Sequence, residues 1–451
     1  MSFPRYPSYK DSGVEWLGEV PEGWRILRMG MLEKSGDDFV SGPFGSSLGS
    51  SHYVESGIPV IRGLNTTLNA ETRFVSDDFV FVGEETFSEL KRCDARPGDL
   101  IFTARGTVGK VGIVPHSIPK ALISPNQLRY RPDLNTLSVD YLFYLFSSSG
   151  LLSEISLIAD SVAQPNLNLG NLRALRVSLP PKDEQTQIAT FLDRETAKID
   201  ELVAEQRRLM ELLKEKRQAV ISHAVTKGLN PDAPMKPSGI EWLGEVPGYW
   251  VVKRFQRCVY VAEGQVDPED TKYSSLALIA PNHIESGTGR LLGLESASDQ
   301  GAESGKYLCK AGDVVYSKIR PALRKVCIAP EDCLCSADMY PLRAHSGLTN
   351  PFLLWSTLSE QFSALAVLES QRVAMPKINR ESLKEVMLAV PPIGEQQSIV
   401  AFIDTETAKL DSLTAEAQRA IDLLQERRTA LISAAVTGQI DVRQLTEKQA
   451  A

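Results

Sequence analysis

The chain contains two copies of the same pair of segments, and this repeat limits its possible folds more than any other feature. Residues 12–24 read SGVEWLGEVPEGW and residues 238–250 read SGIEWLGEVPGYW, with ten of thirteen positions identical. Residues 180–200, PPKDEQTQIATFLDRETAKID, match residues 391–411, PPIGEQQSIVAFIDTETAKLD. Two segments repeated in the same order indicate a protein built from two like halves.

Each PPxxEQ segment begins a long predicted helix. Two prolines precede it, and Gly228 or Gly438 follows its end, as is typical of helix boundaries. Apolar residues then recur in alternating steps of four and three, a seven-residue period that favours two helices packed along a seam. The alternative is two amphipathic helices on separate globular cores. The predicted seam consists of Ile188, Leu192, Ile199, Leu202, Leu209, Leu213, Ile399, Ile403, Leu410, Leu413, Leu424 and Leu431.

Charged residues on the same heptad positions predict the direction of pairing. Parallel helices in repeat register would place Glu195 against Glu406, two like charges. Antiparallel helices would instead bring Glu195 near Arg427 and Lys216 near Glu406. We therefore predict antiparallel pairing, in which Arg427→Glu loosens the coil and Glu195→Lys partly restores it.

The repeats and the segments between them predict an α+β protein with a pseudo-two-fold axis. Short β-branched and aromatic runs separated by Gly, Pro, Asn and Asp indicate strand-rich mixed domains between the helices. The predicted regions are a leader (1–24), variable domain 1 (25–181), a central coiled-coil helix (182–229), a second leader (230–250), variable domain 2 (251–391), a C-terminal coiled-coil helix (392–440) and a tail (441–451).

The two variable domains share one recognisable phrase with an unusual charge distribution. Residues 96–115 read RPGDLIFTARGTVGKVGIVP and residues 310–330 read KAGDVVYSKIRPALRKVCIAP, each typical of a strand, a turn and a strand. Residues 100–132 and 314–330 contain no acid, although the chain has a formal net charge of −8. Acid-free basic stretches at matching places in an acidic protein indicate contact with a polyanion. The alternative is a pair of solvated hairpins whose charges pair with acids elsewhere.

Basic and amide side chains in and near these stretches are the candidate DNA contacts. Arginine, lysine, asparagine and glutamine are the side chains that bind phosphates and read base edges. The Gly and Ser residues of the loops SGPFGSS (41–47) and IRGLN (61–65) also fit simple turns, and QPNLNL (164–169) and MPKINR (375–380) fit a chain reversal shared by both halves. The predicted DNA-binding residues are Ser46, Arg62, Asn65, Arg105, Lys110, Asn126, Gln127, Arg129, Asn282, His283, Lys318, Arg320, Arg324 and Lys325.

Motifs of catalysis, metal binding and export are missing from the sequence. GTVGK (106–110) lacks the glycine and Ser/Thr pattern of a phosphate loop, and the five histidines show no metal-ligand spacing. The six cysteines are scattered, with a single CxC at Cys333 and Cys335, which favours reduced thiols. No apolar run approaches the ~20 residues of a membrane span, and the N-terminus lacks a signal peptide. We expect a cytoplasmic, non-catalytic chain with no metal and no cofactor of its own.

The order of leader, variable domain and PPxxEQ helix, given twice, resembles the DNA specificity subunit of type I restriction-modification enzymes. The resemblance rests on EWLGEVP…W, on LPPKDEQTQIATFLD followed by a heptad helix, and on GDLIFTARGTVGKVGIV and GDVVYSKIRPALRKV, which look like the family's target-recognition domains. It covers essentially the whole chain.

The resemblance implies a function in phage defence. Each recognition domain would read one half of a split, asymmetric site in double-stranded DNA, and the coiled coil would set the gap. Two methyltransferase subunits, which use S-adenosylmethionine to methylate adenine, would dock on the repeats, and ATP- and Mg-dependent restriction/translocase subunits would join through them. Two rival classes remain: a non-DNA scaffold with two interaction domains on a coiled coil, and an enzyme with a cryptic nuclease or methyltransferase site.

Overall fold

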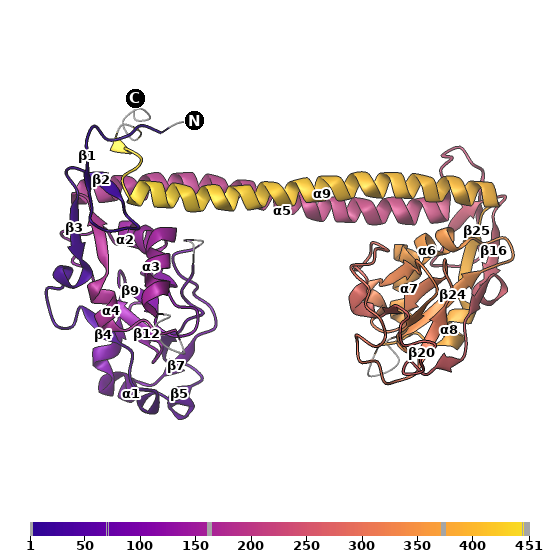
Figure 1. Ribbon diagram of the computed structural model, residues 1–451, viewed down its shortest axis with the longest axis horizontal. Coiled ribbons are helices and arrows are strands. Elements are labelled where there is room, and N and C mark those ends of the chain that lie inside the picture. Colours follow the sequence, from indigo (N-terminus) through magenta and orange to yellow (C-terminus); the bar gives the residue numbers. More distant parts are fainter. Residues whose placement is uncertain are drawn as a thin grey trace. The chain divides into compact units, whose positions relative to one another are not determined.

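The computed structural model describes residues 3–68, 70, 72–159, 165–370, 376–443 and 445. The chain divides into two compact units. Unit 1 comprises residues 1–205 and 419–451, and unit 2 comprises residues 206–418. Each unit therefore contains one variable domain and a part of each long helix (Figure 1). Residues 164 and 375, at the starts of the QPNLNL and MPKINR phrases, and most of the tail lie outside the described residues.

Unit 1 is built around two sheets. A four-stranded antiparallel sheet has the order β10-β9-β12-β4, and a five-stranded sheet has the order β5-β7-β6-β11-β8, in which β6 and β11 are parallel. The leader forms the hairpin β1-β2, and β3 pairs with β13. The strands are β1 (Tyr9–Asp11), β2 (Glu19–Pro21), β3 (Arg25–Arg28), β4 (Phe39–Ser41), β5 (Tyr53–Val54), β6 (Ile58–Ile61), β7 (Val80–Val82), β8 (Asp94–Ala95), β9 (Leu100–Thr103), β10 (Val111–Ile113), β11 (Ala121–Ile123), β12 (Gln127–Tyr130) and β13 (Arg176–Leu179). The helices are α1 (Glu84–Glu89), α2 (Val139–Phe146), α3 (Ser149–Ala159), α4 (Leu169–Ala174) and the first part of α5 (Lys182–Lys227).

Unit 2 repeats this plan with different side chains. Its sheets have the orders β17-β24-β21-β22 and β18-β20-β23-β19, and β19 and β23 are parallel. The second leader forms the hairpin β14-β15, and β16 pairs with β25. The strands are β14 (Met235–Pro237), β15 (Glu245–Pro247), β16 (Val251–Arg254), β17 (Val259–Val261), β18 (Gln265–Val266), β19 (Leu278–Ile279), β20 (Lys306–Cys309), β21 (Val314–Ser317), β22 (Val326–Ile328), β23 (Cys333–Cys335), β24 (Met339–Ala344) and β25 (Met387–Val390). The helices are α6 (Asn350–Leu358), α7 (Glu360–Ser370), α8 (Arg380–Glu385) and the first part of α9 (Ile393–Val436).

The core of each unit joins a sheet to both long helices. In unit 1, one cluster of buried residues includes Phe102 of β9, Ile188 of α5 and Leu431 of α9. In unit 2, the corresponding cluster includes Ile221 of α5 and Ile399 of α9. Because the start of α5 meets the end of α9 in unit 1 and the reverse holds in unit 2, the helices run antiparallel, as predicted. Figure 1 shows the two helices side by side within each unit.

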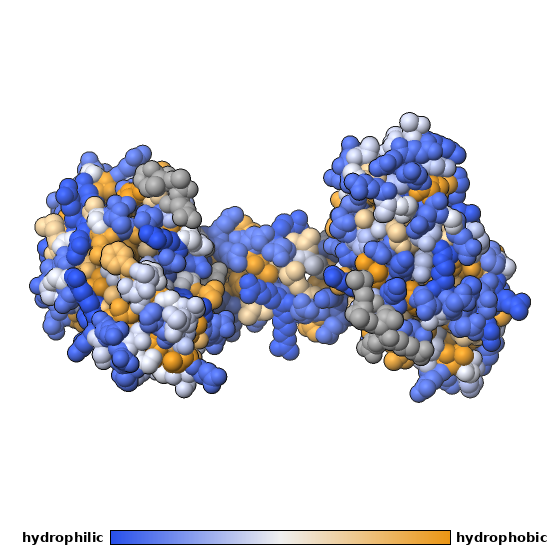
Figure 2. Space-filling model, turned by 90° about the horizontal axis from the view of Figure 1, so that it is seen from below, coloured by the Kyte–Doolittle hydropathy of each residue, from blue (hydrophilic) through white to orange (hydrophobic). Residues whose placement is uncertain are grey.

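The face drawn in Figure 2 carries no single large apolar patch. Hydrophobic residues there are scattered among hydrophilic ones on both units. Within the described residues, no single helix is long and apolar enough to cross a membrane, although α2 and α3 together pass that test as a bent pair. Most of α2 is buried in the core of unit 1.

Four of the twelve predicted seam residues are not buried. Leu202, Leu209 and Leu413 are 44%, 42% and 46% exposed, and Leu424 is half-buried. Thr196 and Thr407, each 4% exposed, occupy the seam instead. Each comes four residues after a buried apolar residue and three residues before the next one, so the threonines take the seam positions that the heptad pattern gave to Glu195 and Glu406. The eight other predicted seam residues are buried.

The shift also changes which charges meet. Arg427 and Lys216 are exposed, and Glu195 forms ion pairs with Arg194 and Lys198. Ion pairs between the helices join Arg428 to Asp200 in unit 1 and Arg217 to Asp411 in unit 2. Each residue of one pair lies 211 residues from its counterpart in the other, the offset of the PPxxEQ repeat. Antiparallel pairing by opposite charges is confirmed, but the predicted residues were wrong. The basic partners lie one position after Arg427 and Lys216, and the acidic partners lie five positions after Glu195 and Glu406.

The PPxxEQ motif joins the leader to the long helix. In unit 1, the indole Nε1–H of the buried Trp24 donates to Glu184 at 3.0 Å. In unit 2, Trp250 donates in the same way to Glu395 at 3.0 Å. The other long helix, α9, ends at a glycine beside Trp24, because a Cβ on Gly438, with φ of +77°, would lie 2.2 Å from Pro21. Each leader is therefore held against its own helix.

The glutamines of the motif hold the chain before α2 and α6. Gln185 accepts from the Ser138 backbone N–H at 2.9 Å, and Gln396 accepts from the Thr349 backbone N–H at 2.9 Å. Both glutamines also donate to a backbone carbonyl of the preceding double-proline segment, at 2.9 and 2.8 Å. The motif thus packs leader, helix and domain together in both units.

Candidate nucleic-acid interface

The shared phrase folds as a strand, a turn and a strand in both units. In unit 1, β9 and β10 pair antiparallel, and the Thr103 N–H donates to the Lys110 carbonyl at 2.9 Å. In unit 2, β21 and β22 pair in the same way, and the Ser317 N–H donates to the Lys325 carbonyl at 2.9 Å. The two hairpins are therefore equivalent parts of the repeat.

A polar groove beside the hairpin of unit 1 brings several predicted residues together. Its lining comes from the loop after β6, the turn between β9 and β10, and the segment before β12. The predicted DNA-binding residues that line it are Arg62, Arg105, Lys110, Asn126 and Gln127. Ser46 lies on the exposed turn Gly45–Ser47, whose first residue also lines the groove. Arginine, lysine and amides converging on an open groove are the side chains that bind a nucleic acid.

The groove residues differ in their freedom to contact a ligand. Arg105 and Asn126 are exposed. Lys110 Nζ donates to the Gly63 carbonyl at 3.5 Å, and Arg62 donates to the Asp78 carbonyl. Arg105 and Asn126 are thus the better placed of these to reach a base edge or a phosphate.

Two of the predicted amide residues are buried. Asn65 is 0% exposed and caps its own loop by accepting from the Arg62 backbone N–H at 2.8 Å. Gln127, 1% exposed, lies at the floor of the groove, where Oε1 accepts from the Thr103 hydroxyl at 3.3 Å. Its Nε2 has no hydrogen-bond partner among the described residues. Asn65 acts on the shape of the loop, while Gln127 presents an unused donor beneath the groove.

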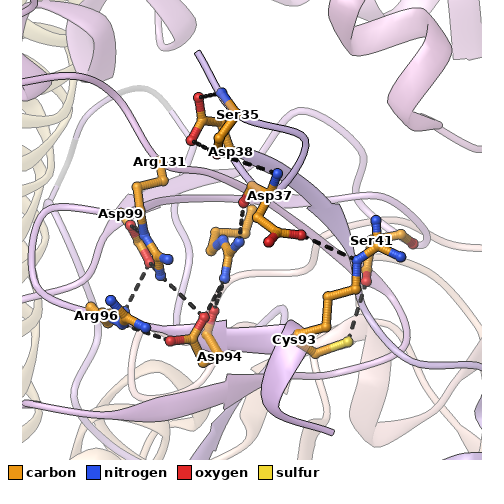
Figure 3. Close-up of polar contacts among 11 residues, drawn as sticks. Ser35, Asp37, Asp38, Ser41, Cys93, Asp94, Arg96, Asp99 and Arg131 are labelled. Carbon is orange, nitrogen blue, oxygen red and sulfur yellow. Dashed lines mark hydrogen bonds and ion pairs between the residues drawn. The ribbon is translucent and has the colours of Figure 1, made fainter. Parts of the chain in front are cut away.

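Arg129 lies in the core instead of on the surface, and we do not include it in the interface. It is 1% exposed, and its guanidinium donates to Asp94 Oδ1 at 2.6 Å. Arg131 and Arg96 also bind Asp94, and Arg131 binds Asp99 (Figure 3). Burial opposes ionisation of Asp94, but the charge of Arg131 and the hydrogen bond from Arg96 hold its pKa below the usual value. The basic residues at the end of the acid-free stretch therefore form a network between the two sheets.

The predicted residues of unit 2 divide in the same way. His283 accepts from the Ala280 backbone N–H at 3.2 Å, and Lys325 donates to the Pro281 carbonyl at 2.6 Å. Lys318 donates to the Ala337 carbonyl at 2.6 Å and lies over the ring of Tyr340. These three side chains hold loops of the unit.

The other predicted residues of unit 2 are two arginines and one asparagine. Arg324 donates to Gln218 of α5 and, at 3.1 Å, to Ser363 of α7. Arg320 and Asn282 are exposed. Arg320 and Asn282 are therefore the residues of this set that are placed to meet a ligand.

The turn of unit 2 carries backbone strain that the turn of unit 1 avoids. Arg320 and Arg324 have φ of 46° and 49°, whereas Gly106 and Gly109 of the matching turn have φ of 91° and 89°. Side chains other than glycine rarely adopt this left-handed region, and such outliers cluster at functional sites. The strain at Arg320 is consistent with selection of an exposed guanidinium at the tip of the hairpin.

Strand pairing reveals candidate residues that the sequence did not show. The Ala104 N–H donates to the Asn126 carbonyl at 2.8 Å, and the Lys318 N–H donates to the Asp338 carbonyl at 3.0 Å. Asn126 and the exposed Asp338 are therefore equivalent. A carboxylate reads the amino group of cytosine, but an acid lying beyond the basic stretch gave no signal for a DNA contact.

The part of the chain that the structure describes contains no metal-binding cluster beside these candidate residues. Among the residues that the structure describes, no group of three or more His, Cys, Asp or Glu side chains is arranged to hold a metal ion. All six cysteines are buried free thiols.

The fold therefore defines a class: two related domains, each with an exposed polar face, joined through a repeated leader and an antiparallel helix pair. The chain belongs to the type I restriction-modification DNA specificity family. The model of the "Type I restriction modification DNA specificity domain" matches residues 51–210 and 279–422.

Individual relatives carry the same description. The EcoDI type I restriction enzyme specificity subunit of Escherichia coli is 29% identical over 319 residues, covering 67% of this chain and 70% of that protein. The EcoKI specificity subunit of Escherichia coli K12 is 20% identical over 450 residues, covering 94% and 90%.

Solved structures show the same fold. A chain from a structure on complex assembly and conformational transition of the type I R-M system matches with a TM-score of 0.68 and 16% identity, covering 92% of this chain and 98% of that one. The HsdS subunit of Thermoanaerobacter tengcongensis matches with a TM-score of 0.52 and 16% identity, covering 93% and 98%.

Proposed function

We propose that this chain is the subunit that gives a type I restriction-modification complex its DNA sequence specificity. Unit 1 reads one half of a bipartite site in double-stranded DNA, unit 2 reads the other half, and the antiparallel helices set the gap. The observation that carries the proposal is the pair of equivalent hairpins whose exposed residues differ between the units. Equivalent scaffolds place each domain on DNA in the same way, and different side chains give unlike half-sites.

The repeat also supports two equivalent docking surfaces. Trp24 with Glu184 and Trp250 with Glu395 join leader and helix by the same hydrogen bond at the same distance. Each methyltransferase subunit docks on one such leader and helix, and the restriction/translocase subunits join through the methyltransferases. S-adenosylmethionine, ATP and Mg are bound by those subunits, and this chain performs no catalysis.

Selection from a random DNA duplex pool tests this function. The chain, assembled with its methyltransferase subunits, is expected to enrich duplexes with two short, unlike motifs at a fixed spacing. Phosphate contacts make binding weaken steeply between about 50 and 200 mM salt. Binding without sequence enrichment, or binding that salt leaves unchanged, would contradict the proposal and favour a non-DNA scaffold.

A further inference from the structure

The loop after β6 in unit 1 and the loop after β19 in unit 2 are the same structural part. The Ser124 N–H donates to the Ile61 carbonyl at 2.9 Å at the end of β6. The Ser336 N–H donates to the Ile279 carbonyl at 2.8 Å at the end of β19. Residues 62–65 and 280–283 that follow are therefore equivalent, one position to one position.

Two side chains clamp this loop in unit 1. Asn65 accepts from the Arg62 N–H at 2.8 Å, and the Asn65 N–H donates to the Arg62 carbonyl at 2.9 Å. Lys110, from the turn between β9 and β10, donates to the Gly63 carbonyl at 3.5 Å. The backbone on both sides of Leu64 is thus fixed.

The same clamp exists in unit 2 with different residues. His283 accepts from the Ala280 N–H at 3.2 Å, and the His283 N–H donates to the Ala280 carbonyl at 3.0 Å. Lys325, from the equivalent place in its hairpin, donates to the Pro281 carbonyl at 2.6 Å. The backbone on both sides of Asn282 is fixed in the same way.

The one residue between the clamps is exposed and chemically different in the two units. Leu64 is 58% exposed although it lines a polar groove beside Arg62 and Arg105. Asn282 is exposed on unit 2. Packing within the protein does not explain why an apolar side chain is exposed among cations and amides. A rigid loop that presents one side chain is what contact with a base requires.

We infer that Leu64 and Asn282 are repeat-equivalent, specificity-determining residues, each contacting one base pair of its half-site. This inference rests on the proposed function. In the major groove, apolar side chains contact the thymine methyl group, and asparagine binds N6 and N7 of adenine. Leu64 therefore contacts a thymine methyl, and Asn282 contacts an adenine edge.

Base analogues in the selected duplex test both contacts without altering the protein. Each thymine is replaced in turn by deoxyuridine, which lacks the methyl group, and each adenine by 7-deazaadenine, which lacks N7. One deoxyuridine in one half-site should weaken binding about fourfold, which corresponds to about 0.8 kcal/mol for one buried methyl group. One 7-deazaadenine in the other half-site should weaken binding about tenfold.

Variants then assign each effect to its residue. Leu64→Ala should bind the thymine and deoxyuridine duplexes equally while keeping the 7-deazaadenine effect, and Asn282→Ala should show the reverse. Leu134→Ala is the matched control, because Leu134 is 53% exposed and lies outside the groove lining. It should keep both effects.

The outcomes separate this inference from the function on which it rests. If selection yields no split motif, the proposed function is wrong, and so is the assignment of Leu64 and Asn282 as base-contacting residues. If a split motif exists but no deoxyuridine effect is found, or the effect persists in Leu64→Ala, the assignment of Leu64 is overturned alone. The corresponding result for 7-deazaadenine and Asn282→Ala overturns the assignment of Asn282.

Discussion

The two units place the same backbone around different chemistry, most clearly between their two sheets. Unit 1 buries the ion pair of Asp94 with Arg129 there. From the strand registers, the equivalent residues in unit 2 are Leu308 and Pro341. A buried ion pair and an apolar pair of similar size are often energetically similar. The same fold therefore accepts either a buried ion pair or apolar residues at these positions. The hydrogen bonds that clamp the loops after β6 and β19 are present in both units.

The largest predicted effect would come from breaking the buried pair of unit 1. Asp94→Ala leaves Arg129 charged, buried and unpaired, which should lower the free energy of unfolding of unit 1 by about 3–5 kcal/mol. In unit 2, Asp313→Ala frees Arg343, whose side chain is 46% exposed, and should cost about 1–2 kcal/mol. Chemical denaturation of both variants measures the difference, and equal losses would contradict the comparison.

Lowering the pH should also weaken the buried ion pair of unit 1. The pKa of Asp94 is lowered in the folded state, because the charge of Arg131 and the hydrogen bond from Arg96 outweigh burial. Its contribution is therefore complete above the unfolded value of about 3.9 and is lost as the pH falls through the folded pKa. Denaturation between about pH 5 and 2 should show this loss in the wild type and a flatter dependence in Asp94→Leu/Arg129→Met. An unchanged pH dependence in the double variant would rule out Asp94 as its source.

The ion pairs of the helices should matter less than the buried pair. Arg428→Met removes charged hydrogen bonds to Asp200 and to the Ala70 carbonyl, at a cost of about 1.5–3 kcal/mol. Arg217→Met should weaken unit 2 through loss of its pair with Asp411. The exposed Arg427 is the matched control, and Arg427→Met should change stability by no more than about 0.5 kcal/mol. A larger effect at Arg427 would contradict the observed pairing and support the heptad register predicted from the sequence.

The leader contacts should respond alike in the two units. Trp24→Phe and Trp250→Phe each remove one indole N–H bond to a carboxylate, worth about 1–2 kcal/mol. Thermal unfolding of the two variants should give similar shifts. A shift confined to one unit would show that the repeated motif is not energetically equivalent.

The smallest predicted effect concerns the hairpin tips. Arg105→Ala and Arg320→Ala should each reduce the salt slope of DNA binding by about one if the arginine contacts a phosphate. Duplex binding at several salt concentrations, with Leu134→Ala as the control, measures this change. An unchanged slope combined with relaxed preference at one base position would instead make the arginine a base reader.

The sequence predicted the repeat, the two domains and the antiparallel helices, because each leaves a strong local signal. It missed the seam register because Thr196 and Thr407 are polar, although their hydroxyls bond back to the helix. It assigned Arg129 to the DNA interface because the sequence alone does not show that this arginine is buried and paired with Asp94, 35 residues away. It did not show that residues 280–283 are equivalent to residues 62–65, because that equivalence depends on strand pairing between distant segments.

Mapping methylated adenine across the genome of cells that express this chain with its methyltransferase subunits tests the central claim most directly. The account predicts one motif with two short, different halves at a fixed gap, absent when this chain is omitted. A complex that assembles and binds S-adenosylmethionine yet methylates without a motif, or at one continuous motif, would contradict the reading of the two units as separate half-site readers.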